Sequence, residues 1–296
     1  MSRINATGRK LPAQFGMAAS MVVWGTIGVF VRNIPLSSSE VALFRALIAL
    51  VILLLYQLVC RRKLPFAAIK KGLLPLCLSG AAMGFNWILL FQAYRYTTVS
   101  MATLCYYFAP VIVMVASPFL FHEHVSRRQV LCFVMATLGL VLMIGTGGSV
   151  AGSSQLTGIL LGLGAAVLYA SVILLNKYIP DISGLDRTQV QFCIAAVVLL
   201  PYVLFGGGFH LQALNGAGLL CLIILGVVHT GICYCVFFSS VPQLSGQQTA
   251  ILSYLDPLVA ILVSVTILGE SMTVWQIIGG LLILCFTLYH DLSKRN

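Results

Sequence analysis

Charged residues are scarce in this sequence. Of its 296 residues, 8% are charged and 60% are hydrophobic, and the mean hydropathy is +1.03. Soluble proteins carry about 25% charged residues, so the composition argues against a water-soluble domain. Seven acidic residues stand against 17 Lys and Arg, which gives a net charge of +10. The basic residues lie in short segments between apolar blocks, so we expect no nucleic-acid partner.

Motifs for catalysis or cofactor binding are also missing. The nine cysteines form no CxxC pair and no metal-ligand spacing, and we interpret them as small apolar packing residues. The sequence contains no P-loop, so nothing indicates ATP as an energy source within this chain. We expect no cofactor, no metal and no enzymatic activity.

Long apolar blocks dominate the sequence instead. Each runs for roughly 18–22 residues, which is enough for a helix to cross a hydrocarbon core of about 30 Å. Backbone groups in lipid need internal partners, and this favours helices over loops. The alternating strands of about 10 residues that are typical of a β-barrel are not found. We predict ten helices near residues 13–31, 40–59, 73–94, 98–120, 128–146, 156–177, 188–205, 217–239, 247–268 and 274–290.

The distribution of Lys and Arg predicts the topology. If the N-terminus is cytoplasmic, only Arg32 and Arg95 fall on the opposite side, and Arg45 lies inside a helix. The other 14 of the 17 basic residues then lie on the cytoplasmic side, as the positive-inside rule requires. The predicted location is a bacterial-type inner (plasma) membrane, with both termini cytoplasmic.

The second half of the chain resembles the first. A shift of 147 positions places Tyr107 on Tyr254 and Pro110 on Pro257. We predict two five-helix repeats, 1–146 and 156–296, joined by a Gly/Ser-rich linker at 147–155. Because five is odd, the second repeat enters the membrane from the opposite side. Inverted repeats are typical of secondary transporters, which bind substrate near the midplane and work by alternating access.

Short motifs resemble a known family. Trp-Gly-Thr-Ile-Gly at 24–28, Phe-Arg-Ala at 44–46 and Leu-Gly-Glu at 268–270 are similar to the EamA-type branch of the drug/metabolite transporter superfamily. Phe-His-Glu at 121–123 departs from the Leu-Gly-Glu expected there. The resemblance implies a central cavity, with the fifth and tenth helices at the periphery, and transport of small organic solutes, often the export of amino acids. The expected partners are a small-molecule substrate and the lipid bilayer, and the chain is expected as a monomer or homodimer.

Two prolines interrupt predicted helices at equivalent repeat positions. Pro110 and Pro257 each lack an N–H and crowd the carbonyl four residues earlier. Such breaks are tolerated in a membrane where they line a cavity or where neighbours restore the bonds. We interpret both as cavity hinges; the alternative is a packing kink.

Asp256 and His229 lie near the centres of their predicted helices. Ionisable groups at this depth usually face a cavity and serve function, so we expect one or both to couple proton movement to transport. The alternative is that Asp256 hydrogen-bonds internally beside Pro257 and that His229 is a satisfied packing residue.

Three further charged positions have two interpretations each. Arg45 either binds a substrate carboxylate or anchors helix packing through backbone carbonyls or Glu40. Glu123 and Glu270 close their predicted helices as solvated turn residues or as gate contacts.

Aromatic residues cluster on the predicted cavity helices. Several lie mid-helix, away from the interfacial belts where Trp and Tyr are common, and their faces can hold ammonium groups and flat apolar side chains. Asn86 is a candidate to orient a polar substrate group. The candidate aromatic substrate-binding residues are Trp24, Trp87, Tyr106, Tyr107, Tyr169, Tyr234 and Tyr254.

The substrate stays open between two classes. A zwitterionic amino acid fits one acidic residue, one basic residue and aromatic rings, whereas an organic cation fits Asp256 with the rings alone. A membrane-embedded enzyme using His229 and Asp256 as an acid–base pair is one rival, but the sequence offers no nucleophile motif to accompany them. A structural or receptor-like membrane protein and a channel are the others.

Overall fold

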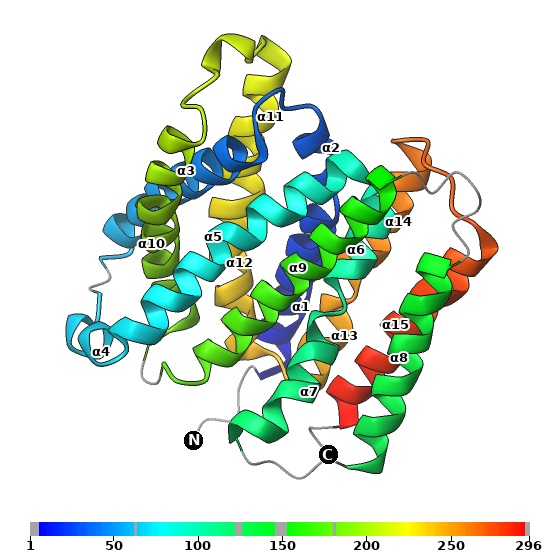
Figure 1. The fold of residues 1–296 in the computed structure, drawn as a ribbon. Coiled ribbons are helices and arrows are strands. Elements are labelled where there is room, and N and C mark those ends of the chain that lie inside the picture. The colour runs from blue at the N-terminus through cyan, green and yellow to red at the C-terminus, as the bar shows by residue number, and fades with distance from the viewer. Residues whose placement is uncertain (1–5, 62–63, 122–125, 146–152, 180–181, 294–296) are drawn as a thin grey trace, which may run out of the picture.

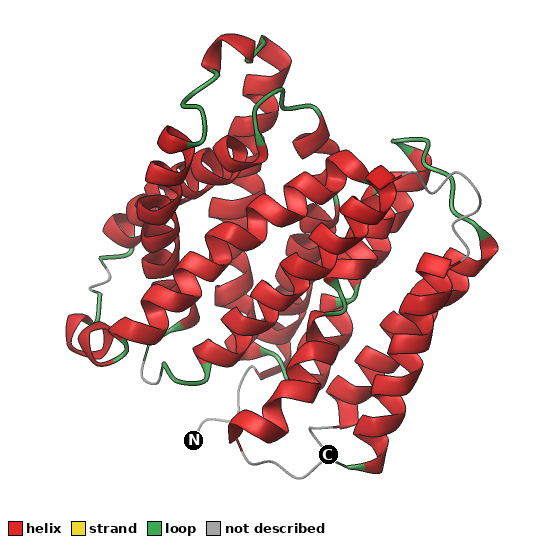
Figure 2. Cartoon of the chain, viewed as in Figure 1, coloured by secondary structure: helices red, strands yellow, loops and turns green. Residues whose placement is uncertain are grey.

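The fold is helical throughout the part of the chain that the structure describes. The computed structural model describes residues 6–61, 64–121, 126–145, 153–179 and 182–293, and these contain no strand (Figures 1 and 2). The helices are α1 (Ala6–Gly25), α2 (Ile27–Arg32), α3 (Ser38–Val59), α4 (Phe66–Lys71), α5 (Leu73–Tyr96), α6 (Val99–Tyr106), α7 (Ala109–Phe121), α8 (Arg127–Gly145), α9 (Ser153–Asn176), α10 (Gly184–Phe205), η1 (Leu211–Ala213), α11 (Gly216–Gly226), η2 (Val227–Ile232), α12 (Cys233–Ser240), η3 (Val241–Gln243), α13 (Gly246–Ser253), α14 (Leu255–Thr266) and α15 (Val274–Ser293).

Several helices are long and apolar enough to cross a membrane. Among the described residues, seven spans meet this condition by length and composition, and two shorter apolar helices follow at Ile251–Thr266 and Val274–Tyr289. The seven spans are Ala13–Arg32, Ser38–Val59, Leu73–Tyr96, Val99–Phe121, Ser154–Asn176, Gly184–Phe205 and Gly216–Gln243. The chain is therefore a multi-pass membrane protein, while the count of ten crossings stays a prediction.

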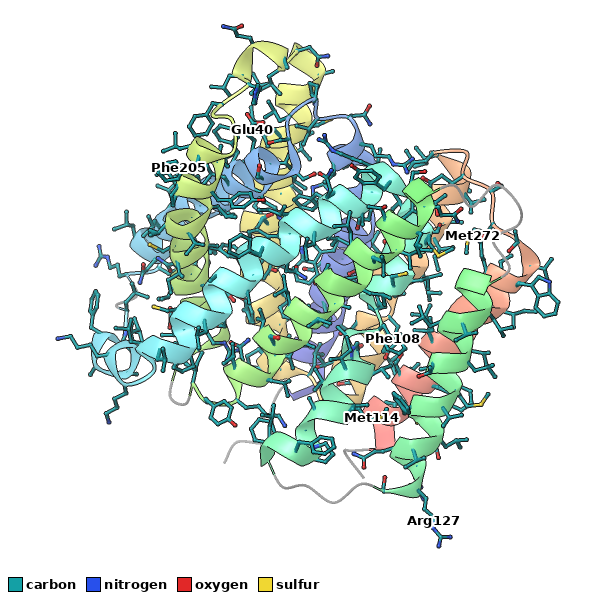
Figure 3. All side chains as sticks on the ribbon, viewed as in Figure 1. Glu40, Phe108, Met114, Arg127, Phe205 and Met272 are labelled. Atoms are coloured by element: carbon teal, nitrogen blue, oxygen red, sulfur yellow. The ribbon has the colours of Figure 1, made fainter. Side chains whose placement is uncertain are left out.

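The distribution of side chains suits a lipid surrounding. Large apolar residues point outward, and Phe119 and Phe205 are 80% and 92% exposed (Figure 3 labels Phe205). Polar residues such as Glu40, Asn86 and Gln191 are buried inside. This is the arrangement expected where the solvent is hydrocarbon and polar groups must find partners within the protein.

Four predicted helices are less regular than their apolar blocks suggest. The first is divided at Thr26 into α1 and α2, and η2 is a π-helical turn between α11 and α12. The fourth predicted helix is broken at 107–108 and the ninth at Tyr254, close to the two prolines. Residues 147–152 of the predicted linker lie outside the described residues, and its last three residues already belong to α9.

Helix bounds and caps recur between the two halves. Helices α6 and α13 both have eight residues and begin 147 positions apart, after the N-caps Thr98 and Ser245. Helices α3 and α10 both have 22 residues, and each begins after a capping serine, Ser37 or Ser183. Such caps satisfy amide groups left free at a helix start. The sequence shift of 147 is thus matched by α6 and α13, and α3 and α10 are offset by 146.

Helices α8 and α15 lie side by side at the right edge of the molecule (Figure 1). The other long helices surround the centre, and α5 packs closely on α9 and α10. This agrees with the peripheral position that the family resemblance implies for the fifth and tenth predicted helices. Helix α1 begins and α15 ends toward the lower end of this view.

Candidate functional site

A cavity of about 410 Å³ lies among the central helices. This volume falls within the range of small-molecule sites. On α5 its lining runs from Met83 to Tyr94, and on α9 from Tyr169 to Asn176, the last residue of that helix. Arg187, in the first turn of α10, also lines it. The cavity therefore reaches from the middle of the bundle to the end where α9 stops and α10 starts.

All seven predicted aromatic residues line this cavity: Trp24, Trp87, Tyr106, Tyr107, Tyr169, Tyr234 and Tyr254. Their rings pack on one another. Tyr106 and Tyr169 are stacked with centroids 5.1 Å apart, and Trp24 lies 5.0 Å from Tyr234. The walls thus offer several ring faces, which suit apolar groups and cations.

Asp256 lies in the cavity wall, where its carboxylate meets the first half of the chain. The Tyr107 hydroxyl donates to Asp256 Oδ2 at 2.6 Å. Both residues lie at helix breaks: Tyr107 directly follows α6, and Asp256 is the second residue of α14, after the break at Tyr254. Pro110 lines the cavity, while Pro257 is buried and is not among the lining residues. The broken backbone therefore brings the predicted acid and tyrosine together.

Arg45 is the cation at the centre of the site. It is 4% exposed, lines the cavity, and donates from Nε to Thr230 Oγ1 at 2.7 Å. Its guanidinium carbon lies 4.5 Å from the Trp87 ring centroid and 5.5 Å from that of Phe91. Among the described residues no carboxylate forms an ion pair with it.

Glu40, which was one candidate anchor for Arg45, has other partners. Glu40 instead caps α3 by accepting from the Ser37 amide at 2.9 Å, and it accepts from the His210 amide at 2.6 Å. Residues 40 and 45 are five positions apart on α3, so at 3.6 residues per turn their side chains point to different faces. Figure 3 shows Glu40 near the upper end of the molecule, beside the segment that follows α10.

His229 is buried away from the cavity lining. Its ring contacts the Thr26 hydroxyl at 2.9 Å and the Ile224 carbonyl at 3.2 Å, and it packs edge-on against Phe30. Its own carbonyl accepts from Trp24 Nε1 at 2.6 Å. The expectation that His229 faces the cavity is therefore corrected: its side chain joins the α1–α2 break to η2.

Asn86 is likewise absent from the cavity lining. Its amide donates to the Ala165 carbonyl at 2.6 Å and so joins α5 to α9. The cavity face of α5 carries Met83, Trp87 and Leu90 at helical spacing, and Asn86 is turned about 100° from Trp87 around the axis. That rotation explains why the sequence proximity of the two residues was misleading.

A polar group at the mouth was missed by sequence reasoning. Arg187, Thr188 and Gln191 line the cavity from one face of α10, and Gln191 Nε2 donates to Asn176 Oδ1 at 2.8 Å. Arg187 was interpreted as a loop charge because of its place between apolar blocks. The spacing of 187, 188 and 191, which lets the three share one helix face, was the available signal.

The opposite end of the bundle is held by an ion pair. Arg32 Nη1 lies 2.5 Å from Glu270 Oε1, and Glu270 Oε2 accepts from the Val99 amide at 2.8 Å and from Ser264 Oγ. Arg32 also donates to the Thr97 carbonyl at 2.8 Å. Of the two interpretations of Glu270, the solvated turn residue is corrected: its side chain is only 7% exposed, and it caps α6, while the gate contact stays open. Glu123 lies outside the described residues.

Comparisons with known proteins identify the family. The family described as "EamA-like transporter family" matches residues 11–145 and again 156–289. "Uncharacterized transporter YxxF" of Bacillus subtilis (strain 168) is 30% identical over 292 residues, covering 97% of this chain and 93% of the relative. An "Uncharacterized transporter" of Archaeoglobus fulgidus is 32% identical over 284 residues, covering 92% of this chain and 94% of the relative.

Two weaker similarities add detail. A Salmonella typhimurium protein named "Probable amino-acid metabolite efflux pump" is 27% identical over 183 residues, covering 58% of this chain and 60% of that protein. A solved structure titled "Crystal structure of protein" has the same fold, with a TM-score of 0.64 at 16% identity, covering 96% of this chain and 99% of that chain. With the family matched in both halves, this chain belongs to the EamA-like transporter family and carries the family's domain twice.

Proposed function

We propose that this protein is a secondary active transporter that exports amino acids or related metabolites by alternating access. One observation carries the proposal: a single cavity presents Arg45, Asp256 and ten aromatic rings, the seven predicted ones among them. An amino acid carries a carboxylate, an ammonium group and a side chain, and the cavity offers a partner of matching chemistry to each. The likeness to a protein named as an amino-acid metabolite efflux pump supports the same class.

The carboxylate is assigned to Arg45. A guanidinium has five N–H donors, and among the described residues its protein acceptor is Thr230, which takes the Nε donor. Asp256 is assigned to the ammonium group, with the Tyr107 hydroxyl fixing the orientation of its carboxylate. The aromatic rings hold the side chain, since ring faces and edges bury large apolar area.

Transport of organic cations is the second candidate. Asp256 and the surrounding tyrosines suit a cation, because ring faces attract positive charge. Arg45 and Arg187 line the same cavity and repel one. Since its described walls carry two cations and one acid, the cavity favours a solute that brings a carboxylate.

Alternating access is supported by the asymmetry between the two ends. The cavity reaches the end near Asn176 and Arg187, while the Arg32–Glu270 pair holds the other end together. We infer ten crossings in two inverted repeats, 1–146 and 156–296, with 147–155 between them and both termini cytoplasmic. In this orientation the cavity faces the cytoplasm, as an exporter requires for loading, in a bacterial-type inner membrane.

Proton coupling is assigned to Asp256. It is the acid among the described cavity-lining residues and contacts both the cavity and the Tyr107 hydroxyl. Replacement by Asn keeps the size and removes the exchangeable carboxyl proton. Asp256→Asn should therefore abolish stimulation of flux by a proton gradient while leaving protein folding intact.

Purified protein in proteoliposomes tests the proposal. Vesicles loaded with labelled phenylalanine or phenethylamine are assayed with and without an imposed pH gradient. Saturable phenylalanine flux that follows the gradient supports an amino-acid carrier coupled to protons. Flux of phenethylamine alone transfers the assignment to organic cations, and gradient-independent flux in both wild type and Asp256→Asn removes the coupling role.

A further inference from the structure

The π-helical turn η2 lies directly behind Arg45. It covers Val227–Ile232 between α11 and α12, and its Thr230 is fully buried. Thr230 is not among the residues that line the cavity. Single π-turns inside α-helices are rare and frequently occur at functional sites. This turn is therefore a candidate for a role at the neighbouring cavity.

The Thr230 hydroxyl has a fixed direction. Its proton is donated to the Leu225 carbonyl at 2.8 Å. A threonine hydroxyl has one donor and two acceptor lone pairs, so towards Arg45 this oxygen can only accept. Arg45 Nε donates to it at 2.7 Å. In this bond the Thr230 oxygen is therefore the acceptor and Arg45 Nε is the donor.

Two glycines bring the turn close enough for this bond. A Cβ on Gly226 or Gly231 would lie 2.6 Å from Ile48 or Ile52 of α3 respectively. Because π bonding joins residues five apart, Gly226 and Gly231 can both face α3. Arg45, Ile48 and Ile52 share one face of α3 at positions i, i+3 and i+7. The backbone at the two glycines therefore packs directly against the two isoleucines, and this brings Thr230 within hydrogen-bond distance of Arg45.

The remaining contacts of Arg45 in the described part of the chain leave the two terminal nitrogens of its guanidinium available. Trp87 and Phe91 contact the guanidinium through their rings and use none of its N–H donors. With Nε held by Thr230, the two terminal nitrogens are the part of the guanidinium that can meet a solute. Two parallel N–H groups match the two oxygens of a carboxylate.

We propose that Thr230 is a positioning residue that makes Arg45 selective for a carboxylate. It holds Nε so that the terminal nitrogens point into the cavity and bind the solute carboxylate end-on. This inference rests on the proposed function, because it takes Arg45 as the carboxylate site. It adds the π-turn as the element that orients the arginine.

Thr230→Val tests the proposal, because valine keeps the shape and removes the hydroxyl. Thr230→Ser, which keeps the hydroxyl, is the matched control. Phenylalanine flux into proteoliposomes gives KM and the maximal rate. Inhibition by 3-phenylpropionate, which lacks the amine, and by phenethylamine, which lacks the carboxylate, separates the two ends of the solute. Binding of 3-phenylpropionate is also measured by the rise in melting temperature of the detergent-purified protein.

We expect Thr230→Val to raise the phenylalanine KM and the 3-phenylpropionate inhibition constant about tenfold, the effect of losing a hydrogen bond to a charged group. The inhibition constant for phenethylamine should stay within twofold of the wild-type value. Thr230→Ser should resemble wild type in all three constants. In an Arg45→Lys background, which has no Nε donor, Thr230→Val should add no further change. If Thr230→Val does not fold, Thr230→Cys keeps the volume with a weaker acceptor and takes its place.

Three results would overturn the proposal in different ways. Equal shifts for 3-phenylpropionate and phenethylamine would mean that Thr230 acts through general packing. Unchanged constants in Thr230→Val would remove its positioning role while the amino-acid transport function stands. If wild type neither transports phenylalanine nor binds 3-phenylpropionate, Arg45 is not a carboxylate site and both assignments fail. Binding without flux in wild type, lost in Thr230→Val, would refute the transport function alone.

Discussion

The Arg32–Glu270 ion pair should control access from its end of the bundle, and Glu270→Gln is the sharpest perturbation. The substitution keeps the shape of the side chain and one oxygen to accept from the Val99 amide. Its amide group then faces the Arg32 guanidinium, donor against donor, and the charge attraction is lost. Arg32 keeps its bond to the Thr97 carbonyl, so the helices it joins stay in place.

The size of the effect follows from burial. Exposed ion pairs contribute about 0.2–1 kcal/mol, whereas removing one partner from a buried pair costs about 3–5 kcal/mol. The Arg32 side chain is 31% exposed and that of Glu270 7%, so this pair lies between the two limits, at about 1–2 kcal/mol. Under alternating access the pair exists only while this end is closed. A loss of that size shifts the equilibrium toward opening by roughly five- to thirtyfold.

Thiol labelling of the cavity measures this shift. A reporter, Ala260→Cys, is placed in a variant from which the nine native cysteines have been removed; Ala260 lines the cavity and is buried. A membrane-impermeant maleimide is applied in turn to each face of sealed vesicles. When the maleimide is applied from the Arg32–Glu270 end, we expect the reporter cysteine to be labelled about tenfold faster in the Glu270→Gln variant than with Glu270 intact. Labelling from the other end should be slower in that variant.

Arg95→Gln provides the matched control. Arg95 lies near the same end, and its guanidinium donates to the Leu36 carbonyl, so both partners belong to the first half of the chain. Removing this cation changes the local charge without breaking a contact between the halves, and labelling should stay unchanged. The reasoning is refuted if Glu270→Gln and Arg95→Gln give the same labelling rates from both faces.

Three further substitutions test the packing around the site. Trp87→Leu removes the ring that lies 4.5 Å from Arg45 and should raise the 3-phenylpropionate inhibition constant about fivefold, as expected for a desolvated cation–π contact. Gly25→Ala places a Cβ 2.6 Å from Val259 Cβ and should destabilise the protein by about 1–3 kcal/mol, seen as a lower melting temperature. Ser37→Ala removes the cap of α3 and should cost about 1 kcal/mol of stability with an unchanged phenylalanine KM.

The sequence was sufficient to predict the apolar helical segments and much of the aromatic part of the cavity wall. Hydrocarbon requires long apolar runs, so the block at 40–59 differs from α3 by only two residues at its start. The aromatic residues were predictable because Trp and Tyr in the middle of a helix have no interface to occupy. Asp256 was predictable because an acid at that depth needs a polar surrounding, which Tyr107 and the cavity supply.

The partners of individual polar side chains were not predictable in the same way. They depend on how each helix is rotated and on breaks that leave little trace in composition. No proline marks the break at Thr26, whose hydroxyl donates to the Val23 carbonyl at 2.7 Å and contacts His229. The π-turn that carries Thr230 also has no proline, and a hydropathy profile shows no interruption there. The ligands of Arg45 could therefore not be assigned from spacing alone.

One short helix connects the two features on which transport would depend. Helix α6 spans Val99–Tyr106, so it is about 12 Å long at 1.5 Å per residue. The amide of its first residue is bound by Glu270 at the closed end, and directly after its last residue Tyr107 donates to Asp256 in the cavity. The break at 107–108 frees this helix from the regular geometry of α7. A solute that draws Asp256 away from Tyr107 therefore acts on the same rigid segment that the Arg32–Glu270 pair holds in place.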